Sequence, residues 1–144
     1  MPMAVVLEAL TDGCSMGGGV FSLGSAAFAL TRVANGQLDA YVDAGRRVLD
    51  TYPELEPEFL RVGEGAVCTN FPYDVAAGAL IVAEAGGVVT LADGASLADH
   101  PAIGSGREEG LAVLASGNPN LHEHLLGALA DGLTSLGAWL AGRG

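Results

Sequence analysis

The chain has 144 residues, of which 50% are hydrophobic, 16% are charged and 22 are glycines. This length suits one domain with a sizeable core, and the apolar composition excludes a disordered chain. The net charge of −11 at pH 7 argues against nucleic acid and against anionic membrane surfaces, because both attract clustered lysine and arginine. The apolar excess suggests a surface that meets a protein partner.

The amino-terminal residues 4–10 are a short apolar stretch, which predicts a strand or the remnant of a larger element. Glu8 interrupts the stretch too early for a signal peptide, and no segment reaches the roughly 18 to 20 apolar residues that span a bilayer. We therefore expect a cytoplasmic protein. Cys14 and Cys68 show no CxxC or Cys/His spacing, so in a reducing compartment we expect two free thiols.

Residues 24–30, with the sequence GSAAFAL, predict a helix that begins with small residues. Such a start leaves the first backbone N–H groups open to an anion. The same small residues also suit close packing against a neighbouring helix, so both interpretations stay open on the residues alone. Asn35-Gly36 ends this helix, and residues 38–42 alternate as a strand does.

The most distinctive stretch is residues 73–87, with the sequence YDVAAGALIVAEAGG. Asp74 precedes a run of small and aliphatic residues, which predicts that it is the N-cap of a helix. The interior of the run has almost no polar face, so we expect this helix to be buried on most sides. Gly86-Gly87 ends it, and residues 88–91 predict a strand.

The carboxyl-terminal part begins with a polar loop over residues 95–110, where Arg107 suits either a solvated loop position or a phosphate contact. Residues 111–115 predict a buried strand. Asn118-Pro119 then predicts a helix start, and leucines at spacings of three and four predict that this helix covers the sheet. His122 and His124 are two residues apart and point to different helix faces. We expect both at the surface.

Four motifs, in order along the chain, resemble the inositol monophosphatase family of Mg²⁺-dependent, Li⁺-sensitive phosphatases. They are residues 24–27 (GSAA), residues 38–42 (LDAYV), residues 73–87, and residues 115–118 (ASGN) with Leu121-His122. The resemblance implies an α/β fold in which helices flank a central mixed sheet, like the second half of that family's αβαβα sandwich. It also implies that residues 1–144 form a single domain.

The resemblance assigns roles to five residues. Asp74 matches a metal ligand, which implies Mg²⁺, and Gly24, Ser25 and Ala26 match the start of the helix that holds the phosphate. Asp43 matches a residue that contacts substrate hydroxyls, although on the residues alone a solvated loop carboxylate fits it equally. The resemblance implies hydrolysis of a phosphate monoester, with inositol phosphate as the first substrate to consider.

Two acidic motifs in the first half of this family bind most of the metal and activate water, and neither occurs here. We therefore assign no catalytic residue to this chain, expect it to supply only half of the active site, and expect it to bind Mg²⁺ weakly or not at all by itself. Its expected partners are a phosphorylated small molecule and either further copies of the chain or a complementary amino-terminal half. The alternative is a non-catalytic domain that associates through an apolar face.

Residues 46–72 depart from the family pattern, so we interpret them as an insertion. Their apolar residues have partial helical spacing, which Pro53 and Pro57 interrupt. We expect short helices at the edge of the site. A lid, a specificity element and a neutral surface insertion are all consistent with this sequence.

Overall fold

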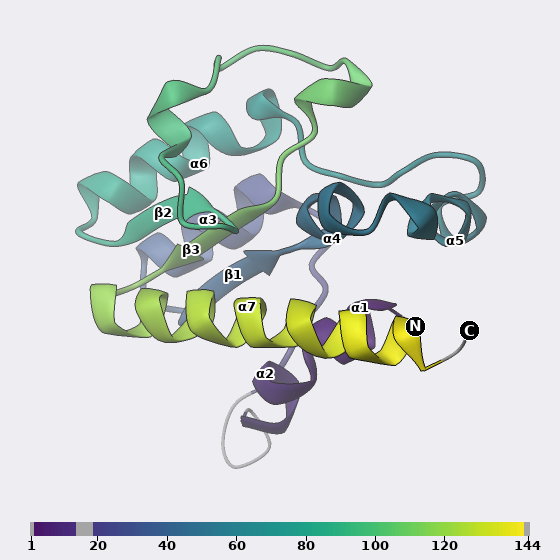
Figure 1. The fold of residues 1–144 in the computed structure, drawn as a ribbon. Coiled ribbons are helices and arrows are strands. Elements are labelled where there is room, and N and C mark those ends of the chain that lie inside the picture. The colour runs from purple at the N-terminus through teal and green to yellow at the C-terminus, as the bar shows by residue number, and fades with distance from the viewer. Residues whose placement is uncertain (1, 14–18, 143–144) are drawn as a thin grey trace.

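The computed structural model describes residues 2–13 and 19–142. Within them, helices surround a small sheet (Figure 1). The elements are α1 (Pro2–Val6), α2 (Glu8–Gly13), α3 (Ala26–Ala34), β1 (Ala40–Asp43), α4 (Gly45–Thr51), η2 (Pro53–Leu55), α5 (Glu56–Val62), α6 (Pro72–Glu84), β2 (Val88–Leu91), η3 (Leu97–Asp99), η4 (Arg107–Glu109), β3 (Val113–Ser116) and α7 (Pro119–Ala141).

The sheet has the strand order β1-β3-β2, and both pairings are antiparallel. Ala115 of the central strand pairs with Tyr41 on one side and with Val89 on the other. The expected α/β class is confirmed, but the described strands form an antiparallel sheet and not a mixed one. The reason is that β3 lies between β1 and β2, so these two strands, which run in the same direction, do not pair with each other.

Helices α3 and α6 cover one face of the sheet, and α7 covers the other (Figure 1). A Cβ atom at Gly78 of α6 would lie 2.7 Å from Leu30 of α3, so the glycine permits close packing of the two helices. The prediction that α6 is buried on most sides is only partly right. Its outer face, which carries Leu80 and Ile81, is exposed.

Helix α7 begins as the sequence predicts. The Asn118 side chain caps it by accepting a hydrogen bond from the Leu121 N–H at 2.9 Å, and Pro119 takes the first helical position. Leu129 and Leu136 are fully buried in the core on this face. Neither α7 nor any other helix of the described residues combines the length and the hydropathy needed to cross a membrane.

The amino-terminal residues form two short helices and not the expected strand. Val6 is buried against α7, where Gly132 leaves room for the Val6 backbone. The expectation was wrong because a short apolar run has no periodicity that separates a buried strand from a buried helix. In residues 46–72 the expected short helices are present as α4, η2 and α5, and their status as an insertion stays a prediction.

His122 is buried, and the prediction of a surface position is wrong for this residue. Its Nδ1 atom lies 3.1 Å from Ser116 Oγ, and its Nε2 atom lies 2.9 Å from Thr90 Oγ1. These partners belong to β3 and β2, so the imidazole ties the first turn of α7 to the sheet. His124 is exposed, as expected.

The burial of His122 predicts a pH-dependent stability. Burial lowers the pKa of His122, so the folded chain favours the neutral ring, whereas the unfolded chain has the usual pKa of about 6.5. This contribution to stability is complete above about pH 6.5 and is lost as the pH falls through the folded pKa. The free energy of unfolding should be measured by urea titration between pH 7.5 and 5. As the pH is lowered, it should decrease less steeply in His122→Gln than in the wild type, by up to about 1.4 kcal/mol per pH unit.

The exposed His124 provides a matched control. His124→Gln should keep the wild-type dependence of the free energy of unfolding on pH, because that ring is in solvent in both states. An equally steep fall in His122→Gln and in the wild type would contradict the assigned role of the buried ring.

Candidate functional site

A cluster of polar side chains lies where β1 ends and α6 begins. The Asn70 side-chain amide nitrogen donates to Tyr41 Oη at 2.7 Å and to Asp43 Oδ2 at 2.6 Å. The Asn70 backbone is fixed in turn, because its carbonyl accepts from the Leu111 N–H at 2.7 Å. Asn70 therefore joins the segment before α6 to the last strand residues of β1.

Asp43 is the last residue of β1 and is half-buried. Its Oδ1 atom accepts from the Gly45 N–H at 3.1 Å. Burial raises the pKa of the Asp43 carboxyl, and the Gly45 hydrogen bond partly opposes this rise. The position therefore differs from a solvated loop carboxylate, one of the two interpretations left open by the sequence.

Asp74 is the third residue of α6 and not its N-cap. The N-cap is Phe71, whose N–H donates to Asp74 Oδ2 at 2.9 Å. The boundary moves because Pro72, which lacks an N–H, takes the first helical position. Asp74 thus stabilises the helix start with one oxygen, and in the described part of the chain its Oδ1 has no hydrogen bond.

Asp43 and Asp74 are both near enough to Tyr41 for their charges to influence its hydroxyl. Burial raises the pKa of the Tyr41 hydroxyl most, the Asn70 hydrogen bond lowers it, and the charges of Asp43 and Asp74 raise it further. In residues 2–13 and 19–142, the ion pairs are Arg46–Asp50, Arg61–Glu58 and Arg107–Glu56. Neither carboxylate of the cluster is among them, so within these residues neither has an arginine at ion-pair distance.

A cavity of about 270 Å³ borders this cluster at Asp43. Cys68 and Phe59 also line it. Cys68 is an exposed free thiol, in agreement with the sequence prediction, whereas Cys14 lies outside the described residues. The cavity gives small molecules access to the side of Asp43.

The predicted phosphate-binding residues lie at the start of α3. Ser25 is the N-cap and accepts from the Phe28 N–H at 3.2 Å, so the helix begins at Ala26 and Gly24 precedes it with a φ of 68°. Within the described residues no hydrogen bond joins these three residues to the cluster around Tyr41. The phosphate role of Gly24, Ser25 and Ala26 stays a prediction.

The site fits a magnesium ion only in part. Mg²⁺ prefers a near-octahedral set of oxygen ligands, and Asp74 Oδ1 and the half-buried Asp43 carboxylate are suitable in kind. Nowhere in the described ranges do three or more His, Cys, Asp or Glu side chains gather in a way that could hold a metal ion.

Asn70 and Tyr41 are the residues of this site that the sequence did not reveal. Asn70 lies three residues before the distinctive stretch 73–87, and its partners precede it by 29 and 27 residues. The only available signal was the alternation of β1, which places Tyr41 and Asp43 on the same side of the strand.

The comparisons with known proteins identify the family of the chain. The sequence model of the inositol monophosphatase family matches residues 2–133. The chain belongs to the inositol monophosphatase family. The family predicted from four motifs is thereby confirmed.

Among solved structures, the inositol monophosphatase from Anabaena (Nostoc) sp. PCC 7120 is similar to this chain, with a TM-score of 0.54 and 28% sequence identity. The match covers 90% of this chain but only 36% of the Anabaena chain. No curated protein sequence matches the chain. The present chain therefore spans little more than a third of the length of that solved family member.

Proposed function

We propose that this chain supplies one half of the active site of a Mg²⁺-dependent phosphomonoesterase. The observation that carries the proposal is that Asn70, just before α6, bonds to both Tyr41 and Asp43, while Asp74 in the first turn of α6 bonds to the Phe71 N–H. No arginine is paired to either carboxylate in the part of the chain that the structure describes. Partly buried carboxylates without a counter-charge attract a cation. Membership of the inositol monophosphatase family supports phosphatase chemistry at this place.

Asp74, Asp43, Asn70 and the start of α3 each have a proposed task. A bound Mg²⁺ would supply positive charge that polarises a phosphoryl group and lowers the pKa of a coordinated water. Asp74 offers Oδ1 to the ion, and Asn70 orients Asp43 so that its carboxylate can accept from a substrate hydroxyl. The first N–H groups of α3, after Gly24 and Ser25, are the proposed contacts of the phosphate oxygens.

The second candidate function is a non-catalytic association module. The exposed apolar face of α6, with Tyr73, Leu80 and Ile81, favours it because such side chains are normally covered. Both candidates include a protein partner: a complementary amino-terminal half in the first, and further copies of the chain in the second. A cytoplasmic setting is part of both proposals.

The chain alone should hydrolyse no inositol monophosphate in the presence of Mg²⁺. Phosphoryl transfer needs several carboxylates around the metal and an activated water, and this chain offers two carboxylates at the cluster. The assay is release of inorganic phosphate by the purified chain, together with calorimetric titration of Mg²⁺, which should show weak binding or none.

Robust turnover by the chain alone would contradict the half-site proposal if Asp74→Asn abolished it. In that event additional carboxylates, such as Glu54, Glu56 and Glu58 of residues 46–72, would have to complete the metal site. Asp131→Asn is the matched control, because Asp131 is exposed on α7, across the sheet from α6.

A further inference from the structure

A second cavity, of about 390 Å³, lies between residues 46–72 and the loop that carries Arg107. Thr69 and Phe71 line it, whereas Asn70 between them bonds to Asp43. Successive side chains of an extended segment point to opposite sides. The cavity therefore lies across this segment from the candidate metal site, and it is a separate place on the molecule.

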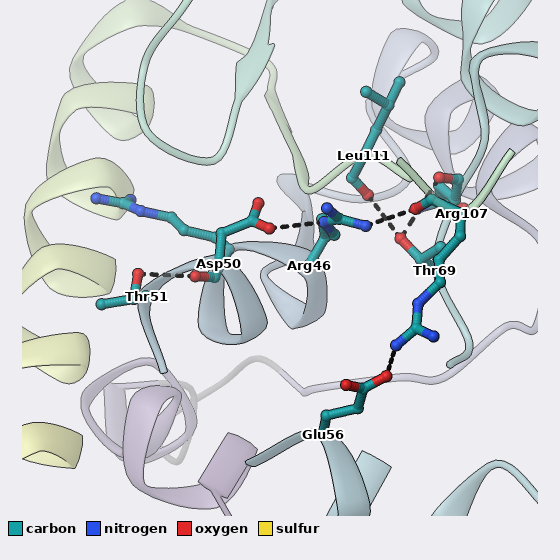
Figure 2. A network of polar contacts seen from close by, with 9 residues as sticks. Arg46, Asp50, Thr51, Glu56, Thr69, Arg107 and Leu111 are labelled. Carbon is teal, nitrogen blue, oxygen red and sulfur yellow. Dashed lines mark hydrogen bonds and ion pairs between the residues drawn. The ribbon is translucent and has the colours of Figure 1, made fainter. Parts of the chain in front are cut away.

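Two arginines from distant parts of the chain line this cavity. Figure 2 shows Arg46 beside the Arg107 backbone and the Arg107 side chain extending to Glu56. The chain has six basic residues, all of them arginine. Arg46 donates from Nε to Asp50 at 2.8 Å and from Nη1 to the Arg107 carbonyl at 2.6 Å. The Arg107 guanidinium is paired with Glu56. Asp50 and Glu56 also line the cavity, so its two guanidinium groups are balanced by two carboxylates. An anionic ligand would bind an arginine here by displacing a carboxylate.

We infer that this cavity is a binding site for a small phosphorylated molecule, and that the Glu56 carboxylate occupies the place of the ligand's phosphate. A guanidinium binds carboxylate and phosphate through the same planar, paired N–H geometry, and a phosphate dianion carries more charge. Ion pairs exposed to solvent contribute only about 0 to 1 kcal/mol. Arg107 is 69% exposed and Glu56 is 37% exposed, so exchange of one anion for the other costs little.

The rest of the lining suits the organic part of such a ligand. Leu49, Leu60 and Phe71 provide apolar surface, and small-molecule sites typically combine apolar walls with a few polar anchors. The Arg46 side chain is only 25% exposed and is paired with Asp50, so the more exposed Arg107 is the proposed anchor of the phosphate. This inference is independent of the proposed phosphatase function.

Phenylphosphonate is a suitable probe, because it has a phosphate-like dianion, an apolar ring and no bond that a phosphatase cleaves. Its binding is measured by NMR titration of the full chain in buffer without metal. Arg107→Gln should weaken binding by up to about fivefold, since an exposed ion pair contributes about 0 to 1 kcal/mol. Glu56→Gln should tighten it severalfold, because it removes the competing carboxylate.

Arg61→Gln is the matched control. Arg61 lies on α5 and is exposed like Arg107, but it pairs with Glu58 and does not line the cavity. Its replacement should therefore leave the affinity for phenylphosphonate unchanged. Arg107 and Glu56 are suitable test positions because both side chains are exposed. Their opposite effects distinguish a ligand site from ordinary surface ion pairs.

Three results would overturn the inference. The first is no binding to either the wild type or Glu56→Gln. The second is equal affinity in these two proteins, because Glu56 would then not compete. The third is binding that survives Arg107→Gln but is lost in Ala26→Leu, which would place the anion at the start of α3 and would support the proposed phosphatase site instead.

Discussion

Inositol monophosphate should be hydrolysed when this chain is mixed with the amino-terminal half of a related family member and Mg²⁺, although neither piece is active alone. The family matches this chain over residues 2–133, and the Anabaena enzyme is far longer than the matched region, which covers 36% of it. A polypeptide with the missing acidic motifs would bring further carboxylates to Asp43 and Asp74. The measurement is phosphate release as a function of the concentration of the added half.

Asp74→Asn should reduce the activity of the mixture at least about 100-fold. Loss of residues that merely support a metal ligand costs 10- to 100-fold, and Asp74 is the proposed ligand itself. Asp131→Asn on α7 should have no effect. Activity that Asp74→Asn leaves intact would show that the mixture does not use this site.

The sequence predicted the elements that have strong local signals. Asn118-Pro119 sets the start of α7 by capping geometry, and Gly86, with a φ of 86°, follows the end of α6 as expected. The strands β1 and β3 run over residues 40–43 and 113–116, where the sequence predicted 38–42 and 111–115. Such small shifts arise because pairing with a neighbouring strand, which is not local, decides where a strand begins.

The sequence could not predict contacts that depend on distant partners. His122 is buried because Thr90 and Ser116 satisfy both ring nitrogens, and nothing within α7 identifies them. Asn70 belongs to the site because its side chain donates hydrogen bonds to Tyr41 and Asp43 of β1, which are distant in the sequence. The error about Asp74 has another cause, because a local signal existed. Pro72 favours the first position of a helix, which indicates that α6 begins two residues before Asp74.

The outer face of α6 is the least explained feature of the fold. Tyr73, Leu80 and Ile81 are 57%, 63% and 46% exposed, and Phe28 of the neighbouring α3 is 49% exposed. A helix that is apolar on all sides is normally buried on all sides. We therefore expect this face to be covered in solution, by further copies of the chain when nothing else is present.

The double variant Leu80→Glu/Ile81→Glu should convert a self-associated chain to a monomer. Burying one Leu or Ile side chain contributes about 1.5 to 3 kcal/mol, so losing two should weaken association by about 3 kcal/mol or more, roughly 100-fold in Kd. Sedimentation velocity over a range of concentrations measures the effect. Val62→Glu is the control, because Val62 is 67% exposed on α5, away from α6 (Figure 1).

The same double variant separates the two candidate functions when it is added to the complementary half. If α6 is the contact with that half, the variant should lose the gain in phosphatase activity together with self-association, since one apolar face serves both partners. Loss of self-association without any activity in either mixture would favour the association module. Self-association that persists in the variant would exclude the α6 face as the contact between copies.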